Sequence, residues 1–68
     1  MKDLFITYQG GSEGLAPNMV AFEAPFPGQG DQVRIRGRTY RVTGREYSVE
    51  HGDLGYRGEL TGLTVEPA

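Results

Sequence analysis

The chain has 68 residues, of which 37% are hydrophobic and 24% charged, and its formal net charge is −2. A chain of this length forms one domain, residues 1–68, with a thin core, because small domains bury a modest share of their surface. It contains no cysteine and one histidine. This composition excludes a disulfide framework and a cysteine-ligated zinc site, and we expect no cofactor and no metal.

The amino-terminal residues do not resemble a signal peptide, because their apolar run is limited to residues 4–6. Nothing in the sequence approaches the roughly 20 consecutive apolar residues of a membrane-spanning helix. The lack of cysteine is compatible with a reducing compartment. We therefore expect a cytoplasmic protein that makes no contact with a membrane.

Alternation of apolar and polar side chains predicts strands from the start of the chain. The first covers residues 3–8, with Leu4 and Tyr8 on its apolar face, and the glycine-rich residues 10–14 end it. The second covers residues 19–24, and it ends at Pro25 because proline cannot donate a hydrogen bond to a neighbouring strand.

The clearest pattern is a hairpin over residues 33–42, entered through a turn at 28–31 and reversed at Gly37. After Val42 the apolar positions change parity, and Gly44 stands at the change, which predicts a β-bulge.

A further turn is expected at residues 51–55, followed by a last strand over 56–65 in which Gly58 and Gly62 permit bending or a close approach of another backbone. No window shows a helical period free of glycine and proline. The sequence predicts an all-β fold, a small five-stranded partly open barrel of the SH3-like or OB-like kind. We expect alternate side chains along the strands, from Leu4 to Val65, to face one shared interior.

The main electrostatic feature is a cluster of arginines. Five of the seven basic residues lie within residues 34–45, where no acidic residue occurs. They are Arg34, Arg36, Arg38, Arg41 and Arg45. Strand alternation places Arg34, Arg36 and Arg41 on the outward face of the hairpin.

Three interpretations of this arginine cluster stay open. It is a solvated face that discourages edge-to-edge aggregation, a docking surface for an acidic protein partner, or part of a nucleic-acid site. The last is the weakest, because an aromatic residue beside the charges, Tyr40, has inward parity and the whole chain is acidic.

No set of residues in the sequence predicts catalysis. Ser48, His51 and Asp53 are the residue types of a hydrolase triad but are too close in sequence to form the relay. Glu50 with His51 and Asp53 gives too few ligands for a metal site. The glycines of residues 28–30 precede a strand, whereas a dinucleotide-binding loop precedes a helix. We expect a chain that is not an enzyme.

Some apolar residues fall on irregular faces or in loops, and they either close the ends of the barrel or form a partner or homo-oligomer interface. These residues are Phe5, Met19, Phe26 and Leu54.

Residues 30–42, with the sequence GDQVRIRGRTYRV, are similar to a pattern found in many short bacteriophage and prophage proteins. In these proteins a Gly-Asp pair leads to an alternating apolar strand, a glycine turn and a Tyr-x-Val strand. The resemblance covers about a third of the chain, describes a hairpin, and transfers no functional residue. It implies a viral origin and a small barrel that serves as a virion component or binds and blocks a host protein.

The function that the sequence favours is a non-enzymatic protein-binding module, encoded by a phage and directed at a host protein. Its docking surface would be the arginine-rich hairpin face, its partner would have an acidic surface, and it would act in the host cytoplasm. One alternative is a virion or connector subunit that assembles with copies of itself. The other is a small nucleic-acid-binding barrel, whose affinity would fall steeply with salt.

Overall fold

The structure is a computed structural model, and it describes residues 1–10 and 16–68. The described residues form five strands and no helix, so the all-β prediction is confirmed. The strands are β1 (Lys2–Tyr8), β2 (Met19–Phe22), β3 (Gln32–Ile35), β4 (Arg38–Gly52) and β5 (Gly55–Pro67).

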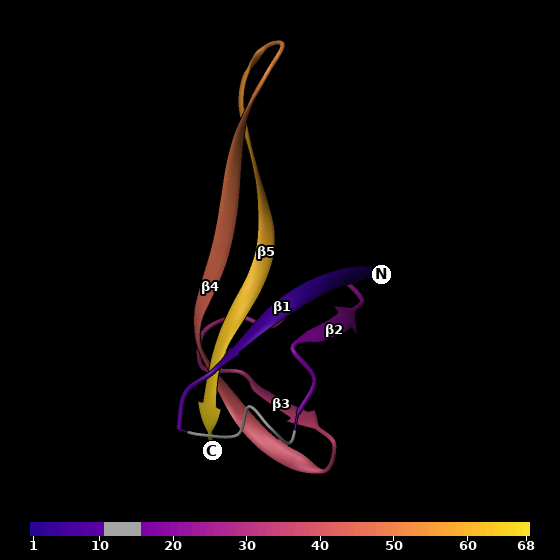
Figure 1. The fold of residues 1–68 in the computed structure, drawn as a ribbon, viewed down its shortest axis with the longest axis vertical. Coiled ribbons are helices and arrows are strands. Elements are labelled where there is room, and N and C mark those ends of the chain that lie inside the picture. Colours follow the sequence, from indigo (N-terminus) through magenta and orange to yellow (C-terminus); the bar gives the residue numbers. More distant parts are fainter. Residues whose placement is uncertain (11–15) are drawn as a thin grey trace.

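The strands form one mixed sheet in the order β2-β1-β5-β4-β3, curled into a half-barrel (Figure 1). The chain's first and last strands, β1 and β5, run parallel at the centre of the sheet, and every other pair is antiparallel. The short strands β2 and β3 are the two edges. The predicted partly open barrel is therefore confirmed, with its closure left incomplete between these edges.

The core lies on the concave side and is built from alternate residues of the central strands. Leu4, Ile6 and Tyr8 of β1 are buried, as their alternation predicts. They pack with the buried residues of the rest of the chain, and Phe26 packs against this cluster from a loop. These further buried residues are Ala16, Ile35, Tyr40, Val42, Leu60, Leu63 and Val65.

Two irregularities in the pairing of β4 with β5 set the curvature. The first lies between Val42 and Gly44, which confirms the predicted bulge. The second lies opposite Thr61, because Glu46 pairs with Gly62 whereas Tyr47 pairs with Leu60. The additional residue changes the parity of β5, so that both Leu60 and Leu63 face the core.

Gly62 lies at a close approach of two strands. A Cβ atom at this position would lie 2.7 Å from the carbonyl oxygen of Phe5, on the parallel neighbour β1. The close approach that the sequence predicts for Gly58 or Gly62 is thus confirmed at Gly62, and a side chain there would push β1 away from β5.

Turns fall close to their predicted places. Arg36 and Gly37 join β3 to β4 with positive φ angles of 51° and 79°, the conformation that tight hairpin turns require. Before β3, Asp31 accepts a hydrogen bond from the backbone N–H of Gly28 at 2.8 Å. The predicted break at residues 10–14 lies largely outside the described residues.

The expectation of one shared interior from Leu4 to Val65 is wrong for the middle of β4. Tyr47 and Val49 are mostly exposed, although they continue the alternation. The reason is that β4 and β5 extend past the ends of their neighbours, and no other described strand reaches this part of the hairpin.

Candidate interaction surface

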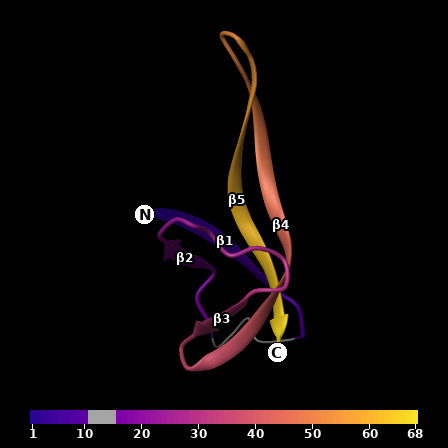
Figure 2. The same ribbon diagram turned by 180° about the vertical axis from the view of Figure 1, so that it is seen from behind.

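The outer part of the β4–β5 hairpin, residues 46–59, projects from the half-barrel, and we call it the hairpin arm (Figures 1 and 2). Beyond the second bulge six cross-strand pairs, from Tyr47–Leu60 to Gly52–Gly55, hold it together. At the usual rise per strand residue these pairs make the arm about 20 Å long. The arm accounts for much of the 42 Å long axis of the molecule, whose other extents are 21 and 19 Å.

One side of the arm carries a row of apolar and aromatic side chains, which we call the aromatic face: Tyr47, Val49, His51 and Tyr56. These residues share a side because cross-strand partners lie on the same side of a sheet. The exposed fractions are 58% for Tyr47, 64% for Val49 and 79% for Tyr56. Leu54, in the turn at the tip, is fully exposed.

Contacts within the aromatic face orient its rings. The rings of His51 and Tyr56 meet edge to face, with centroids 5.3 Å apart and planes at 81°. The guanidinium carbon of Arg45 lies 5.6 Å from the ring centroid of Tyr47, within the range of a cation–π contact. The tyrosines are therefore partly ordered before any partner binds, which lowers the entropic cost of binding.

The opposite side of the arm is polar. Ser48 pairs with Glu59 and Glu50 with Arg57 across the strands, and together with Gly58 these residues line a shallow open groove. Glu59 also forms an ion pair with Lys2 of β1, with 3.1 Å between Nζ and Oε2. This contact ties the base of the arm to the sheet.

The arm separates the residues of the hypothetical catalytic and metal sites. Ser48 and Glu50 point to the polar side, whereas His51 shares the aromatic face with Tyr56. Ser48 and His51 therefore form no relay. Within the described residues, no three histidine, aspartate or glutamate side chains gather in a way that could hold a metal ion.

The arginine cluster is divided among several surfaces. Arg34 and Arg41 pair with Thr39 and Gln32 on the outer side of the β3–β4 hairpin, as predicted, but Arg36 lies in the turn. Arg38 pairs with Ile35 and Arg45 with Leu63, two buried residues of the other side. The five exposed arginines therefore do not form a single row.

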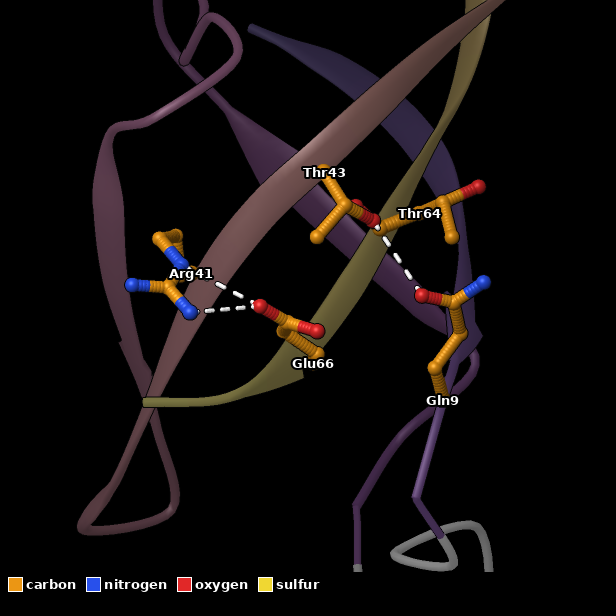
Figure 3. Close-up of polar contacts among 5 residues, drawn as sticks. All are labelled: Gln9, Arg41, Thr43, Thr64 and Glu66. Carbon is orange, nitrogen blue, oxygen red and sulfur yellow. Dashed lines mark hydrogen bonds and ion pairs between the residues drawn. The ribbon is translucent and has the colours of Figure 1, made fainter.

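Arg41 is engaged within the chain (Figure 3). Its Nη2 and Nε atoms donate to Oε1 of Glu66 at 2.6 and 3.2 Å, and the two residues are cross-strand neighbours on β4 and β5. Nearby, the Thr43 hydroxyl lies 3.4 Å from the side-chain oxygen of Gln9. A partner would have to compete with Glu66 for Arg41, so this arginine is a weaker candidate than the sequence indicates.

Tyr8 and Tyr40 form the polar part of the core. Their rings meet edge to face with centroids 5.2 Å apart, and the Tyr8 hydroxyl donates a hydrogen bond to the carbonyl oxygen of Pro17. Burial raises the pKa of Tyr8, Tyr40 raises it further, and Arg36 lowers it. The buried Tyr40 hydroxyl has no hydrogen-bond partner among the described residues.

The four apolar residues singled out in the sequence have different outcomes. Phe26 is partly buried against the core. Phe5 and Met19 are about half exposed and pair with each other across β1 and β2, and Leu54 forms the tip of the arm. Sequence reasoning missed the aromatic face, because the alternation of Tyr47 and Val49 is typical of a buried strand. One feature of the sequence did indicate that Tyr47 and Val49 are exposed: the chain has too few further strand residues to cover them.

None of the described residues forms a helix with the length and hydropathy needed to cross a membrane. Comparison of the chain with protein-family models, with curated proteins and with solved structures finds no match.

Proposed function

We propose that this chain is a non-enzymatic protein-binding module whose docking surface is the aromatic face of the hairpin arm. The observation that carries the proposal is the exposure of Tyr47, Val49 and Tyr56 on an arm that stands away from the half-barrel. A small domain rarely exposes large apolar side chains to water, because burying them would stabilise its thin core.

The chemistry of the aromatic face suits a protein partner. Tyrosine provides a large contact area at a low cost in side-chain entropy, and it is enriched among the residues that dominate interface energies. The outer edges of the arm also present backbone N–H and C=O groups, since no third described strand pairs with them. A partner strand could add to either edge.

The arginines have a secondary role in this proposal. Arg34 and Arg38 are exposed and form no ion pair within the described part of the chain. They would steer the encounter with an acidic surface, while the tyrosines supply most of the affinity. We extend to this chain the phage origin that the hairpin resemblance implies, and we propose the cytoplasm of a bacterial host as its place of action.

Capture experiments from a bacterial lysate test the proposal. The full chain is immobilised, and the proteins retained by the wild type are compared with those retained by Tyr47→Ser and Tyr56→Ser. We expect both variants to lose the same proteins, because removing a central tyrosine from an interface costs about 2 kcal/mol or more. Met19→Ser is the matched control, since Met19 is similarly exposed but lies on β2.

The control separates this proposal from non-specific adhesion. Equal losses in Met19→Ser and Tyr56→Ser would show that any exposed apolar residue matters and would contradict a docking role for the arm. Retention that disappears after nuclease treatment or moderate salt would instead support the nucleic-acid alternative.

A further inference from the structure

Charge is segregated along the molecule. The arm, residues 46–59, carries four acidic residues and one arginine, whereas residues 32–45 carry five arginines and no acidic residue. Figure 1 places the β3–β4 turn and the tip of the arm at opposite ends of the long axis. The acidic residues of the arm are Glu46, Glu50, Asp53 and Glu59.

The charges at the two ends include groups that form no ion pair in the described part of the chain, although Glu50 has Arg57 as its cross-strand neighbour. Arg34 and Arg38 form no ion pair near the β3–β4 turn, and neither do Glu50 and Asp53 on the arm. The ion pairs among the described residues are Lys2–Glu59 and Arg41–Glu66, so an exposed charge outside these two ends, such as Asp3, also has none. Opposite ends of a 42 Å molecule cannot neutralise each other within one copy.

We propose that the hairpin arm of one copy docks across the β3–β4 hairpin of a second copy, in a head-to-tail arrangement. This inference rests on the proposed function, and it names a second copy of this chain as the partner of the arm. The arm lies beside β3 of the next molecule, so that Glu50 on the polar side of the arm meets Arg34 on the outer side of the β3–β4 hairpin. The aromatic face, on the other side of the arm, adjoins the side that carries Arg38, and Asp53 reaches the same hairpin from the tip.

The dimensions and the sheet edges suit this arrangement. An arm about 20 Å long matches the two short extents of the molecule, 21 and 19 Å. On the receiving copy, β3 is an edge strand whose outer backbone groups have no partner strand among the described residues. Pairing of the arm with this edge would satisfy both open edges at once.

The contact is heterologous, because the arm and the β3–β4 hairpin are different surfaces of the chain. Repetition of a heterologous contact gives a ring when the rotation closes and a filament when it does not. The assembly would therefore grow beyond a dimer, whereas a twofold contact between two arms would stop at a dimer.

Sedimentation of the full chain over the micromolar to millimolar range, at low and high salt, is the first test. We expect species larger than a dimer at low salt and dissociation at high salt, since exposed ion pairs are screened. A strict monomer at every concentration would overturn the proposal, as would a dimer that salt does not affect.

Charge reversal at each end identifies the surfaces. We expect Arg34→Glu/Arg38→Glu and Glu50→Lys/Asp53→Lys each to weaken self-association roughly tenfold or more, because paired charges become repulsive. The matched control for the arm variant is Asp3→Lys/Glu23→Lys, which raises the net charge by the same amount at exposed positions outside both surfaces. Circular dichroism checks that each variant is folded. If Glu50→Lys/Asp53→Lys is unfolded, the neutral variant Glu50→Gln/Asp53→Asn replaces it.

Mixing the two charge-reversed variants is the decisive experiment. In a head-to-tail contact the reversed arm of one variant attracts the reversed arginine surface of the other, and the unchanged arm of the second attracts the unchanged arginine surface of the first. We expect alternating hetero-oligomers in the mixture, although each variant alone self-associates weakly. Absence of hetero-oligomers would overturn the proposed contact.

The outcomes separate this inference from the proposed function. If the chain is monomeric but Tyr56→Ser loses a captured protein that Met19→Ser retains, the arm is a docking surface and its partner is not a second copy. If sedimentation shows head-to-tail assembly that Tyr56→Ser leaves unchanged, the charges act alone, which overturns the part of the aromatic face in this contact, and the capture experiment alone then decides the proposed function.

Discussion

The half-barrel and the hairpin arm share two strands and one alternating pattern, but their inward-facing side chains have different surroundings. In the half-barrel, Leu63 and Val65 of β5 pair with Ile6 and Tyr8 of β1, and both are fully buried. In the arm, Tyr56 of the same strand occupies an equivalent position and is 79% exposed. Alternation therefore indicates which side of a strand is apolar, whereas burial of that side depends on whether another part of the chain packs against it.

The sharpest difference is expected for a large-to-small substitution in the half-barrel. Leu63→Ala removes a fully buried side chain next to the parallel strand. It should lower the free energy of unfolding by about 2–5 kcal/mol, the usual cost of a leucine-sized cavity. Urea denaturation followed by circular dichroism measures the change. A cost below about 1 kcal/mol would mean that the core is loosely packed.

A substitution at the junction of the two regions should rank next. Gly62→Ala places a Cβ atom 2.7 Å from the Phe5 carbonyl oxygen, so β1 must shift. We expect a loss of about 1–3 kcal/mol, the typical cost of overpacking. Gly58→Ala is the matched control, because a Cβ there meets its nearest atom, in Val49, at an ordinary 3.6 Å. Equal costs at the two glycines would contradict the close approach of β1 and β5.

The polar part of the core gives a smaller, pH-dependent effect. Tyr8→Phe removes the hydrogen bond to Pro17 and should cost about 1 kcal/mol near neutral pH. Since burial raises the pKa of Tyr8 above its ordinary 10.0, the folded state favours the protonated hydroxyl. The contribution is complete below pH 10.0 and declines as the pH rises toward the folded-state pKa. Denaturation of both proteins at neutral and alkaline pH should show their difference narrowing, and a constant difference would contradict this account.

The smallest effect is expected on the arm. Tyr56→Ser should change the free energy of unfolding by no more than about 0.5 kcal/mol, because the side chain is mostly in water and its main ring contact is with His51. The same thermal or urea unfolding experiment checks it. A loss comparable to that of Leu63→Ala would show that the arm folds against the half-barrel in solution, which would remove the reason for regarding its aromatic face as a docking surface.

Local sequence pattern determined most of the strand positions. The apolar face of β1, the turn at Gly37 and the bulge at Gly44 all follow from residue type and parity, because alternation, positive φ and bulges are short-range properties of the chain. The second bulge, opposite Glu46 and Tyr47 at Thr61, was not predicted, although Gly62 beside it was expected to permit bending, because the extra residue becomes visible only when β4 and β5 are aligned.

The placement of the candidate site was decided by the tertiary structure. The sequence shows that arginines cluster between residues 34 and 45, but the turn at Arg36 and the pairing of Arg38 with Ile35 divide them among different surfaces. It likewise shows Tyr47 and Tyr56 as strand residues without showing that they are exposed. Strand order, relative strand length and the parallel pairing of β1 with β5 come from contacts between distant segments, and those contacts determine which apolar side chains are covered.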